Sequence, residues 1–286
     1  MRTDAALRGR TAGAARRAAL ALCLSAIVVA GALAARGIEP FATWCYPLLW
    51  YPTLAALDLA AAPRAGGFFW LDRPRFAFGL FAWSVVGWCV FEALNFRVRN
   101  WYYVFVPDDP VVRWAGVAIS YATVFPAIWL AERWLRGHGV AVRWTCPRVR
   151  VTPGLRRGCA ALGVAFLAAA AAWPSLFYPF IWGAVTLLLE PWNYARDPRR
   201  SLLGDLERGH PGRIVRLALG GLAVGFLWEL YNVPAASRWI YTVPGFETFK
   251  LFEMPVPGFL GFAVFAWDVF VMVQWLVLRG VLSPPE

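Results

Sequence analysis

Long runs of apolar residues, separated by short polar segments, make up most of this chain. Several runs approach the length of roughly 20 residues that a helix needs to cross a bilayer. The pattern therefore predicts an all-α fold, a polytopic membrane helix bundle of about eight transmembrane helices. The expected spans are residues 18–35, 41–62, 76–95, 112–134, 158–173, 176–192, 214–231 and 256–278.

The longest polar segment between these runs divides the chain into two halves. We expect a cytoplasmic basic tail at 1–17, a first membrane half at 18–134, a cytoplasmic basic linker at 135–157, a second membrane half at 158–279 and a cytoplasmic tail at 280–286. A cleaved signal peptide over 1–34 is the alternative, since Ala32-Leu33-Ala34 has the small residues of a cleavage site. We favour a retained helix, because the second half also opens with a helix of small residues.

Short motifs recur in both halves in the same order. The recurring pairs are Tyr46-Pro47-x-x-Trp50 with Tyr178-Pro179-x-x-Trp182, Asp58 with Glu190, Glu92-x-x-Asn95 with Glu229-x-x-Asn232, and Trp101-x-Tyr103 with Trp239-x-Tyr241. Coincidence in an aromatic-rich chain is the alternative, but the constant order argues against it. Four spans in each half is an even number, so we expect parallel repeats about an axis along the membrane normal.

The composition supports the membrane interpretation. The 286 residues are 60% hydrophobic and only 16% charged, and they include 17 tryptophans and 21 phenylalanines. A soluble domain of this composition would expose large apolar patches. The five cysteines form no Cys-x-x-Cys motif and the two histidines lie in basic loops, so we expect no disulfide, no metal site and no cofactor.

The net charge of +11 comes almost wholly from arginine, since Lys250 is the only lysine. Basic residues lie in short loops between apolar runs, where they set orientation, so we expect no nucleic-acid partner. All fall on one side of the expected bundle except Arg36, Arg97, Arg99, Arg113, Arg238 and Lys250. The positive-inside rule puts both termini in the cytoplasm and both Glu-x-x-Asn motifs at the outer face. The preference for Arg and Ala suggests a GC-rich bacterial genome, and hence a bacterial inner membrane.

Several acids stand in or beside apolar runs, where a carboxylate is costly unless it is paired or functional. We expect Glu229 and Asp268 to face one cavity in the outer half of the bilayer. Glu92, the counterpart of Glu229, should contribute less, because Thr123 takes the place of Asp268 in the first half. The alternative for each acid is a structural role, since hydrogen bonds between membrane helices are common.

Six polar or aromatic residues near these acids are candidates for substrate binding: Asn232, Trp239, Tyr241, Asn95, Trp101 and Tyr103. An interfacial aromatic belt is the alternative for the tryptophans and tyrosines, and the two outer connectors that hold them could be amphipathic and lie on the outer leaflet. Asp58 and Glu190 should lie near the arginine-rich face, where pairing gives them a structural role. Gly221 and Gly225, one turn apart, predict close packing of their helix.

Three motifs of the second half, Trp228-Glu229-x-x-Asn232, Trp239-x-Tyr241-x-x-Pro244 and Phe252-Glu253-Met254-Pro255-x-x-Gly258, resemble a signature of uncharacterised bacterial multi-span membrane proteins. The layout of repeated helices, buried Glu and aromatic connectors also distantly resembles the lycopene cyclase and membrane terpene cyclase group. That resemblance implies duplicated small bundles whose carboxylates protonate an isoprenoid olefin or epoxide.

Three functions stay open from the sequence. An enzyme acting on a lipid-soluble, isoprenoid-like substrate would use the acids in general acid/base catalysis and the aromatic rings to stabilise a carbocation. A proton-coupled transporter of a small or amphiphilic solute would use the same acids along a wet path from Glu229 to Glu190. A purely structural membrane protein is the third. The expected partners are membrane lipid and, for the enzyme, a lipid-soluble small molecule.

Overall fold

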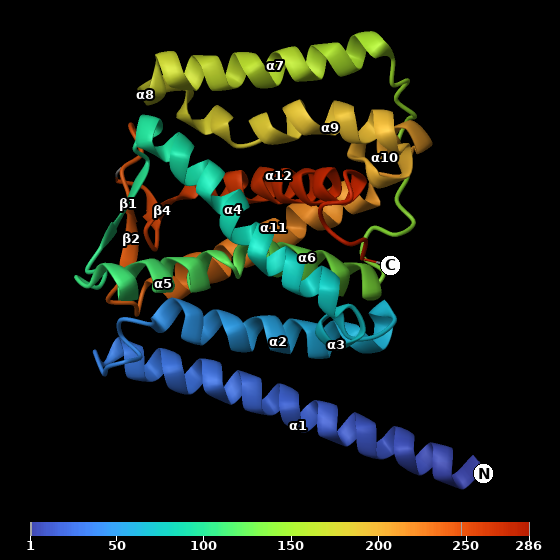
Figure 1. The fold of residues 1–286 in the computed structure, drawn as a ribbon, viewed down its shortest axis with the longest axis vertical. Helices are drawn as coiled ribbons and strands as arrows, with labels where there is room; N and C mark the ends of the chain where they lie inside the picture. Colours follow the sequence, from blue (N-terminus) through green and yellow to red (C-terminus); the bar gives the residue numbers. More distant parts are fainter. Residues whose placement is uncertain (1, 247, 286) are drawn as a thin grey trace.

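The computed structural model describes residues 2–246 and 248–285, with side chains from residue 12 onward. The fold is all-α apart from two short two-stranded sheets. The helices are α1 (Arg2–Ala35), α2 (Cys45–Ala65), α3 (Phe69–Asp72), α4 (Pro74–Val98), α5 (Pro110–Tyr121), α6 (Val124–Gly137), α7 (Pro153–Ala172), α8 (Pro174–Phe177), α9 (Ala184–Arg196), α10 (Leu202–Arg208), α11 (Gly212–Asn232) and α12 (Phe259–Leu278). Figure 1 shows that α1, α2, α6, α7, α9 and α12 run roughly along one direction, while α4 crosses them obliquely.

Six helical segments are long and apolar enough to cross a membrane: Ala12–Ala35, Pro74–Val98, Pro110–Gly137, Pro153–Ala172, Gly212–Asn232 and Val256–Leu278. The chain is therefore a multi-span integral membrane protein. The second and sixth spans expected from the sequence correspond to α2 and α9, which are not among these six.

Both of these helices are packed between others, and each departs from a simple span. Helix α2 lies between α1 and α6 and carries Pro52, Asp58 and Pro63. Helix α9 lies between α7 and α12, and its 13 residues extend about 20 Å, less than the roughly 30 Å of a hydrocarbon core. Protein neighbours let such segments carry polar groups that lipid would not tolerate.

The expected fourth span is divided into α5 and α6, which are separated by Ala122 and Thr123. Pro126 lies in the first turn of α6. A proline ring has no N–H and collides with the carbonyl of the residue four positions earlier, so it favours a kink or a break in the helix at this point. The kink expected at Pro126 is thus a break just before it.

The close packing predicted from Gly221 and Gly225 is confirmed. Helix α11 packs along α12, and a Cβ at Gly221 would collide with the Phe262 carbonyl oxygen, while one at Gly225 would collide with the Phe262 ring. Small residues at these two positions therefore let the two backbones approach each other.

The aromatic connectors form β structure between distant parts of the chain. Strand β1 (Trp101–Val104) pairs antiparallel with β2 (Arg238–Tyr241). Strands β3 (Lys250–Leu251) and β4 (Met254–Pro255) form a tight hairpin. Figure 1 shows β1, β2 and β4 gathered at one end of the bundle, on the left of the view. The connectors are thus paired to each other, which the sequence did not predict.

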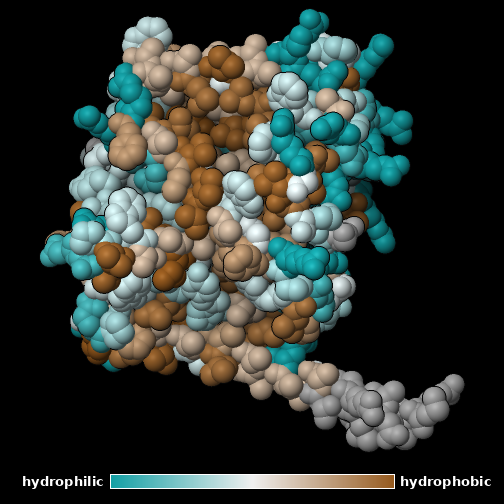
Figure 2. Space-filling view, in the orientation of Figure 1, coloured by the Kyte–Doolittle hydropathy of each residue, from teal (hydrophilic) through white to brown (hydrophobic). Residues whose placement is uncertain are grey.

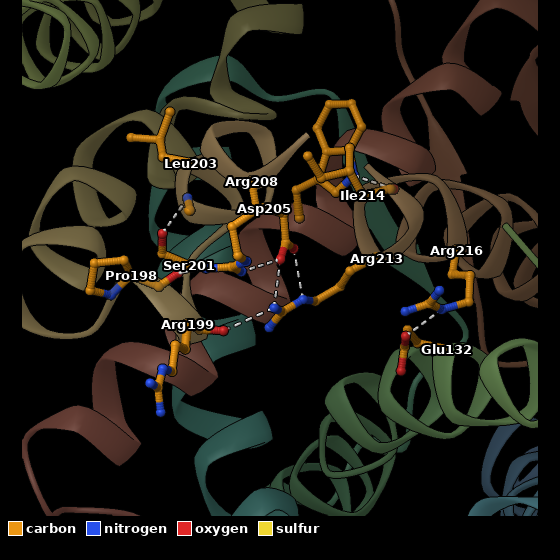
Figure 3. A network of polar contacts seen from close by, with 12 residues as sticks. Glu132, Pro198, Arg199, Ser201, Leu203, Asp205, Arg208, Arg213, Ile214 and Arg216 are labelled. Carbon is orange, nitrogen blue, oxygen red and sulfur yellow. Dashed lines mark hydrogen bonds and ion pairs between the residues drawn. The ribbon is translucent and has the colours of Figure 1, made fainter. Parts of the chain in front are cut away.

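The opposite end of the molecule is polar and rich in arginine. Figure 2 shows hydrophilic side chains along the right edge, and a broad apolar area across the middle. Figure 3 shows part of this end, where Arg208 and Arg213 approach Asp205 at 2.7 and 2.8 Å and Arg216 approaches Glu132 at 2.7 Å.

Asp58 and Glu190 each cap the start of a short helix at this end. Asp58 accepts hydrogen bonds from the backbone N–H of Phe69 (2.7 Å) and Trp70 (3.3 Å), at the start of α3. Glu190 accepts one from Leu203 (2.7 Å), at the start of α10. Neither acid forms a salt bridge with an arginine within the described residues, because backbone N–H groups supply the direct partners. These contacts agree with the structural role expected for both acids near the arginine-rich end.

Candidate functional site

A cavity of about 1080 Å³ lies at the end of the bundle that carries β1 and β2. Its walls come from α2, α4, β1, α5, β2 and α12 and from the short 3-10 turn Tyr178–Ile181. Most of the lining is apolar or aromatic, and it includes Trp88, Trp101, Trp182, Trp228, Trp239 and Phe265. A large apolar cavity with a few polar groups is the usual form of a small-molecule site.

Glu92 projects from α4 into the lining of this cavity. Its Oε1 accepts three hydrogen bonds, from Trp88 Nε1 at 2.9 Å, Trp101 Nε1 at 3.2 Å and the Tyr103 hydroxyl at 2.6 Å. The Tyr121 hydroxyl lies 3.4 Å from that of Tyr103 and extends the cluster. Since all three donors converge on Oε1, Oε2 is the oxygen with capacity for a further partner.

Glu229 repeats this arrangement in the second half. Its Oε1 accepts hydrogen bonds from Trp239 Nε1 at 3.3 Å and from the Tyr241 hydroxyl at 3.1 Å. Burial raises the pKa of Tyr241 well above its ordinary value, so this phenol stays protonated and donates. Glu229 itself is fully buried and is not among the residues that line the cavity.

The two asparagines of the Glu-x-x-Asn motifs hold the connectors against the helix ends. Asn95 Nδ2 donates to the Trp101 carbonyl at 2.8 Å, and Asn232 Nδ2 donates to the Trp239 carbonyl at 2.8 Å. In return, the Asn232 Oδ1 accepts from the Trp239 N–H at 3.1 Å. Neither asparagine lines the cavity, so each positions a tryptophan that does.

The strand pairing joins the two motifs symmetrically. In the register of β1 and β2, Trp101 lies opposite Tyr241 and Tyr103 lies opposite Trp239. The tryptophan of each motif is therefore beside the tyrosine of the other. All four of these side chains, which the sequence nominated for substrate binding, line the same cavity.

Asp268 has a different environment from the one expected. Its Oδ2 accepts from the Gly183 N–H at 2.8 Å, and its Oδ1 accepts from the N–H and the hydroxyl of Thr186, both at 2.7 Å. Asp268 thus caps the start of α9 from α12, and it is fully buried. The shared cavity expected for Glu229 and Asp268 is wrong: neither carboxyl lines it, whereas Glu92 does.

An aromatic cluster that forms part of the cavity wall was not predicted from the sequence. Trp182 stacks on Phe91 with ring centroids 5.4 Å apart and on Trp101 at 6.0 Å. Phe265 meets Trp88 at 5.5 Å and Trp228 at 5.9 Å. The spacing of Trp88 and Glu92, one helical turn apart, could have indicated their contact. The contact between the Trp182 and Phe265 rings depends on tertiary packing, so no local sequence pattern indicates it.

The lining also includes two arginines. Arg113 and Arg238 are the only cations among the described lining residues, and Glu92 is the only acid. Within residues 2–246 and 248–285, no group of three or more His, Cys, Asp and Glu side chains is placed to hold a metal ion.

Comparison with known proteins identifies no relative, since no family model, no curated protein and no solved structure matches this chain.

Proposed function

We propose that this integral membrane protein is an enzyme that acts on a lipid-soluble, isoprenoid-like molecule, with Glu92 as its general acid and base. The observation that carries the proposal is the large aromatic cavity into which a single carboxylic side chain reaches. Aromatic faces stabilise cations, and an olefin that gains a proton becomes a carbocation.

The chemistry needs no co-reactant. In its protonated form, Glu92 gives a proton to one carbon of a double bond, and the other carbon becomes cationic. The cation rearranges or closes a ring, and a neighbouring carbon then returns a proton to the carboxylate, so that the product is an isomer of the substrate. The hydrogen bonds to Oε1 hold the carboxyl in place through both transfers.

A comparison of lipid extracts tests this proposal. Hosts that make different isoprenoids are grown with and without the gene, and their apolar lipids are separated and weighed by mass spectrometry. We expect a new compound with the mass of a host isoprenoid and a different retention time. Identical extracts from all hosts would overturn the proposal.

The proton-coupled carrier hypothesis has less support. Its path would connect Glu229 to Glu190, but neither of these residues lines the cavity, and Glu190 caps a helix at the arginine-rich end. A carrier would also be expected to offer polar groups along its route.

We also propose that residues 18–134 and 158–279 are parallel repeats. The support is the matching set of hydrogen bonds around Glu92 and Glu229, and the strand register that relates them. Trp50 packs on Trp228 at 5.8 Å, and its counterpart Trp182 packs on Phe91, the counterpart of Trp228.

The arginine-rich end is proposed to face the cytoplasm of a bacterial inner membrane, with both termini on that side and the chain crossing eight times, α2 and α9 included. Reporters fused after residue 286 and after residue 107 test this orientation. The reporter after residue 286 should be cytoplasmic, and the reporter after residue 107 should be periplasmic. The reversed locations, or both reporters on the same side of the membrane, would contradict the proposed orientation.

A further inference from the structure

We infer that the ligand of the cavity is an amphiphile whose anionic head, a carboxylate or a phosphate, binds between Arg113 and Arg238. This inference rests on the proposed function only in that it concerns the same cavity. Both arginines are among the residues that line that cavity and are partly buried, and neither forms a salt bridge with a described residue.

The hydrogen-bonding capacity of these two side chains is largely unused. The Nε atoms of both arginines are buried and have no hydrogen-bond partner within the described residues. Arg113 Nη2 donates to the Asp108 carbonyl at 3.0 Å, and no described carboxylate forms a salt bridge with Arg113. A cation in apolar surroundings is costly unless it is paired, and the planar guanidinium fork matches carboxylate and phosphate oxygens.

The two arginines lie near the same loop. Arg238 is opposite Val104 in the strand pair, and the neighbouring Ser237 hydroxyl donates to the Phe105 carbonyl at 2.7 Å. Arg113 contacts Asp108, only a few residues further along this loop. Val106 and Pro107, between these contacts, also line the cavity, so both cations belong to one part of its wall.

Helix α5 sets the distance from this anion site to Glu92. Arg113 lies in its first turn, and Tyr121, whose hydroxyl is beside that of Tyr103, is its last residue. Eight residues at 1.5 Å each separate Arg113 from Tyr121 by about 12 Å along the axis. An apolar chain anchored by its head at the arginines would thus reach the Glu92 carboxyl along the α5 face.

The test uses two ligands that differ only in the head group, farnesol and farnesyl monophosphate. Binding to the full chain in phosphatidylcholine nanodiscs is followed by tryptophan fluorescence, since several tryptophans line the cavity. We expect the phosphate to bind at least about tenfold more tightly than the alcohol. The double variant Arg113→Gln with Arg238→Gln should reduce this preference to about twofold or less, without weakening farnesol binding.

Arg99→Gln is the matched control, because Arg99 lies at the same end of the molecule but is exposed and outside the lining. It should keep the full preference. Equal binding of the two ligands by the wild type, or a preference that survives in the double variant, would overturn the inference. If both ligands bind equally well, the anion site is contradicted but the cavity can still bind an apolar ligand. If neither ligand binds, the cavity itself is contradicted as a ligand site, together with the proposed function.

Two further arms identify the source of the anion. Farnesoic acid shows whether a carboxylate head serves as well as a phosphate. Nanodiscs that contain phosphatidylglycerol show whether a bilayer lipid competes for the arginines. Displacement of farnesyl monophosphate by phosphatidylglycerol, but not by inorganic phosphate, would identify the occupant as a membrane lipid, and each of these results still requires the two arginines.

Discussion

Glu92 and Glu229 have matching hydrogen-bond donors but different access to the cavity. In both, the tryptophan and the tyrosine of the following strand donate to Oε1. Glu92 faces the cavity, whereas Glu229 is closed off and has the backbone of Met254 close by. The hydrogen bonds fix the orientation of both carboxyls, and access to the cavity separates the candidate catalyst from its buried copy.

The short bond from Tyr103 to Glu92 gives a prediction at this scale. Tyr103→Phe removes a 2.6 Å hydrogen bond to a carboxyl group, which is typically worth about 1.5–3 kcal/mol, so conversion of the ligand should slow about tenfold or more. Tyr102→Phe is the control, because Tyr102 is next in the strand and has its side chain on the other face. Equal rates for the two variants, measured on the lipid product, would show that the bond is not used.

At the scale of elements, polar side chains inside the bundle mainly organise helix ends. Asp58, Glu190 and Asp268 all accept backbone N–H groups at the start of a helix. The four free N–H groups at a helix start need partners, and water is scarce among packed apolar helices. Asp268 thereby also fixes Gly183, which follows the cavity-lining Trp182.

Asp268→Asn should destabilise the fold. An asparagine side chain keeps one acceptor oxygen and places an NH₂ group against an N–H that now has no acceptor, at a cost of about 1–3 kcal/mol in the free energy of unfolding. Thermal unfolding in detergent measures the change. Thr186→Val, which removes only the hydroxyl bond, should have the smaller effect, and the opposite order would contradict the capping role.

The packing of α11 on α12 gives a second prediction for this scale. Gly225→Ala should lower the free energy of unfolding by about 1–3 kcal/mol, because the added methyl group overlaps the Phe262 ring. Gly158→Ala in α7 has open space around it and should be neutral or stabilising. Equal stabilities of the two variants in the same unfolding assay would show that the helices are not held this closely.

Periodicity and composition were enough to predict most helices and the glycine contact, because these depend on residues near each other in the chain. The prediction failed where distant segments meet. Nothing around Asp268 indicates that its donors are Gly183 and Thr186, more than 80 positions away. The pairing of β1 with β2 could not be predicted from the sequence either, because an aromatic strand and an aromatic interfacial loop have similar compositions.

At the scale of the whole molecule, the two halves meet around one cavity, and their polar parts are divided between two ends. The arginine-rich end holds the ion pairs of Asp205 and Glu132 (Figure 3), and the other end holds the strands (Figure 1). The hydrogen bonds of Glu92 and Glu229 to residues of these strands place both glutamates at that end. The six candidate spans were predictable from apolar runs. Which of the two glutamates is open to the cavity was not, because that depends on how the β3–β4 hairpin and its neighbours fill the space beside Glu229.

The most direct test of the account compares Glu92→Gln with Glu229→Gln. Both changes keep the shape and one oxygen of the side chain and remove the ionisable proton, and both sites have matching donors. Conversion of the host isoprenoid is measured in lipid extracts at equal amounts of folded protein in the membrane. The account predicts that Glu92→Gln abolishes conversion and that Glu229→Gln retains most of it. Loss of activity only in Glu229→Gln would contradict it.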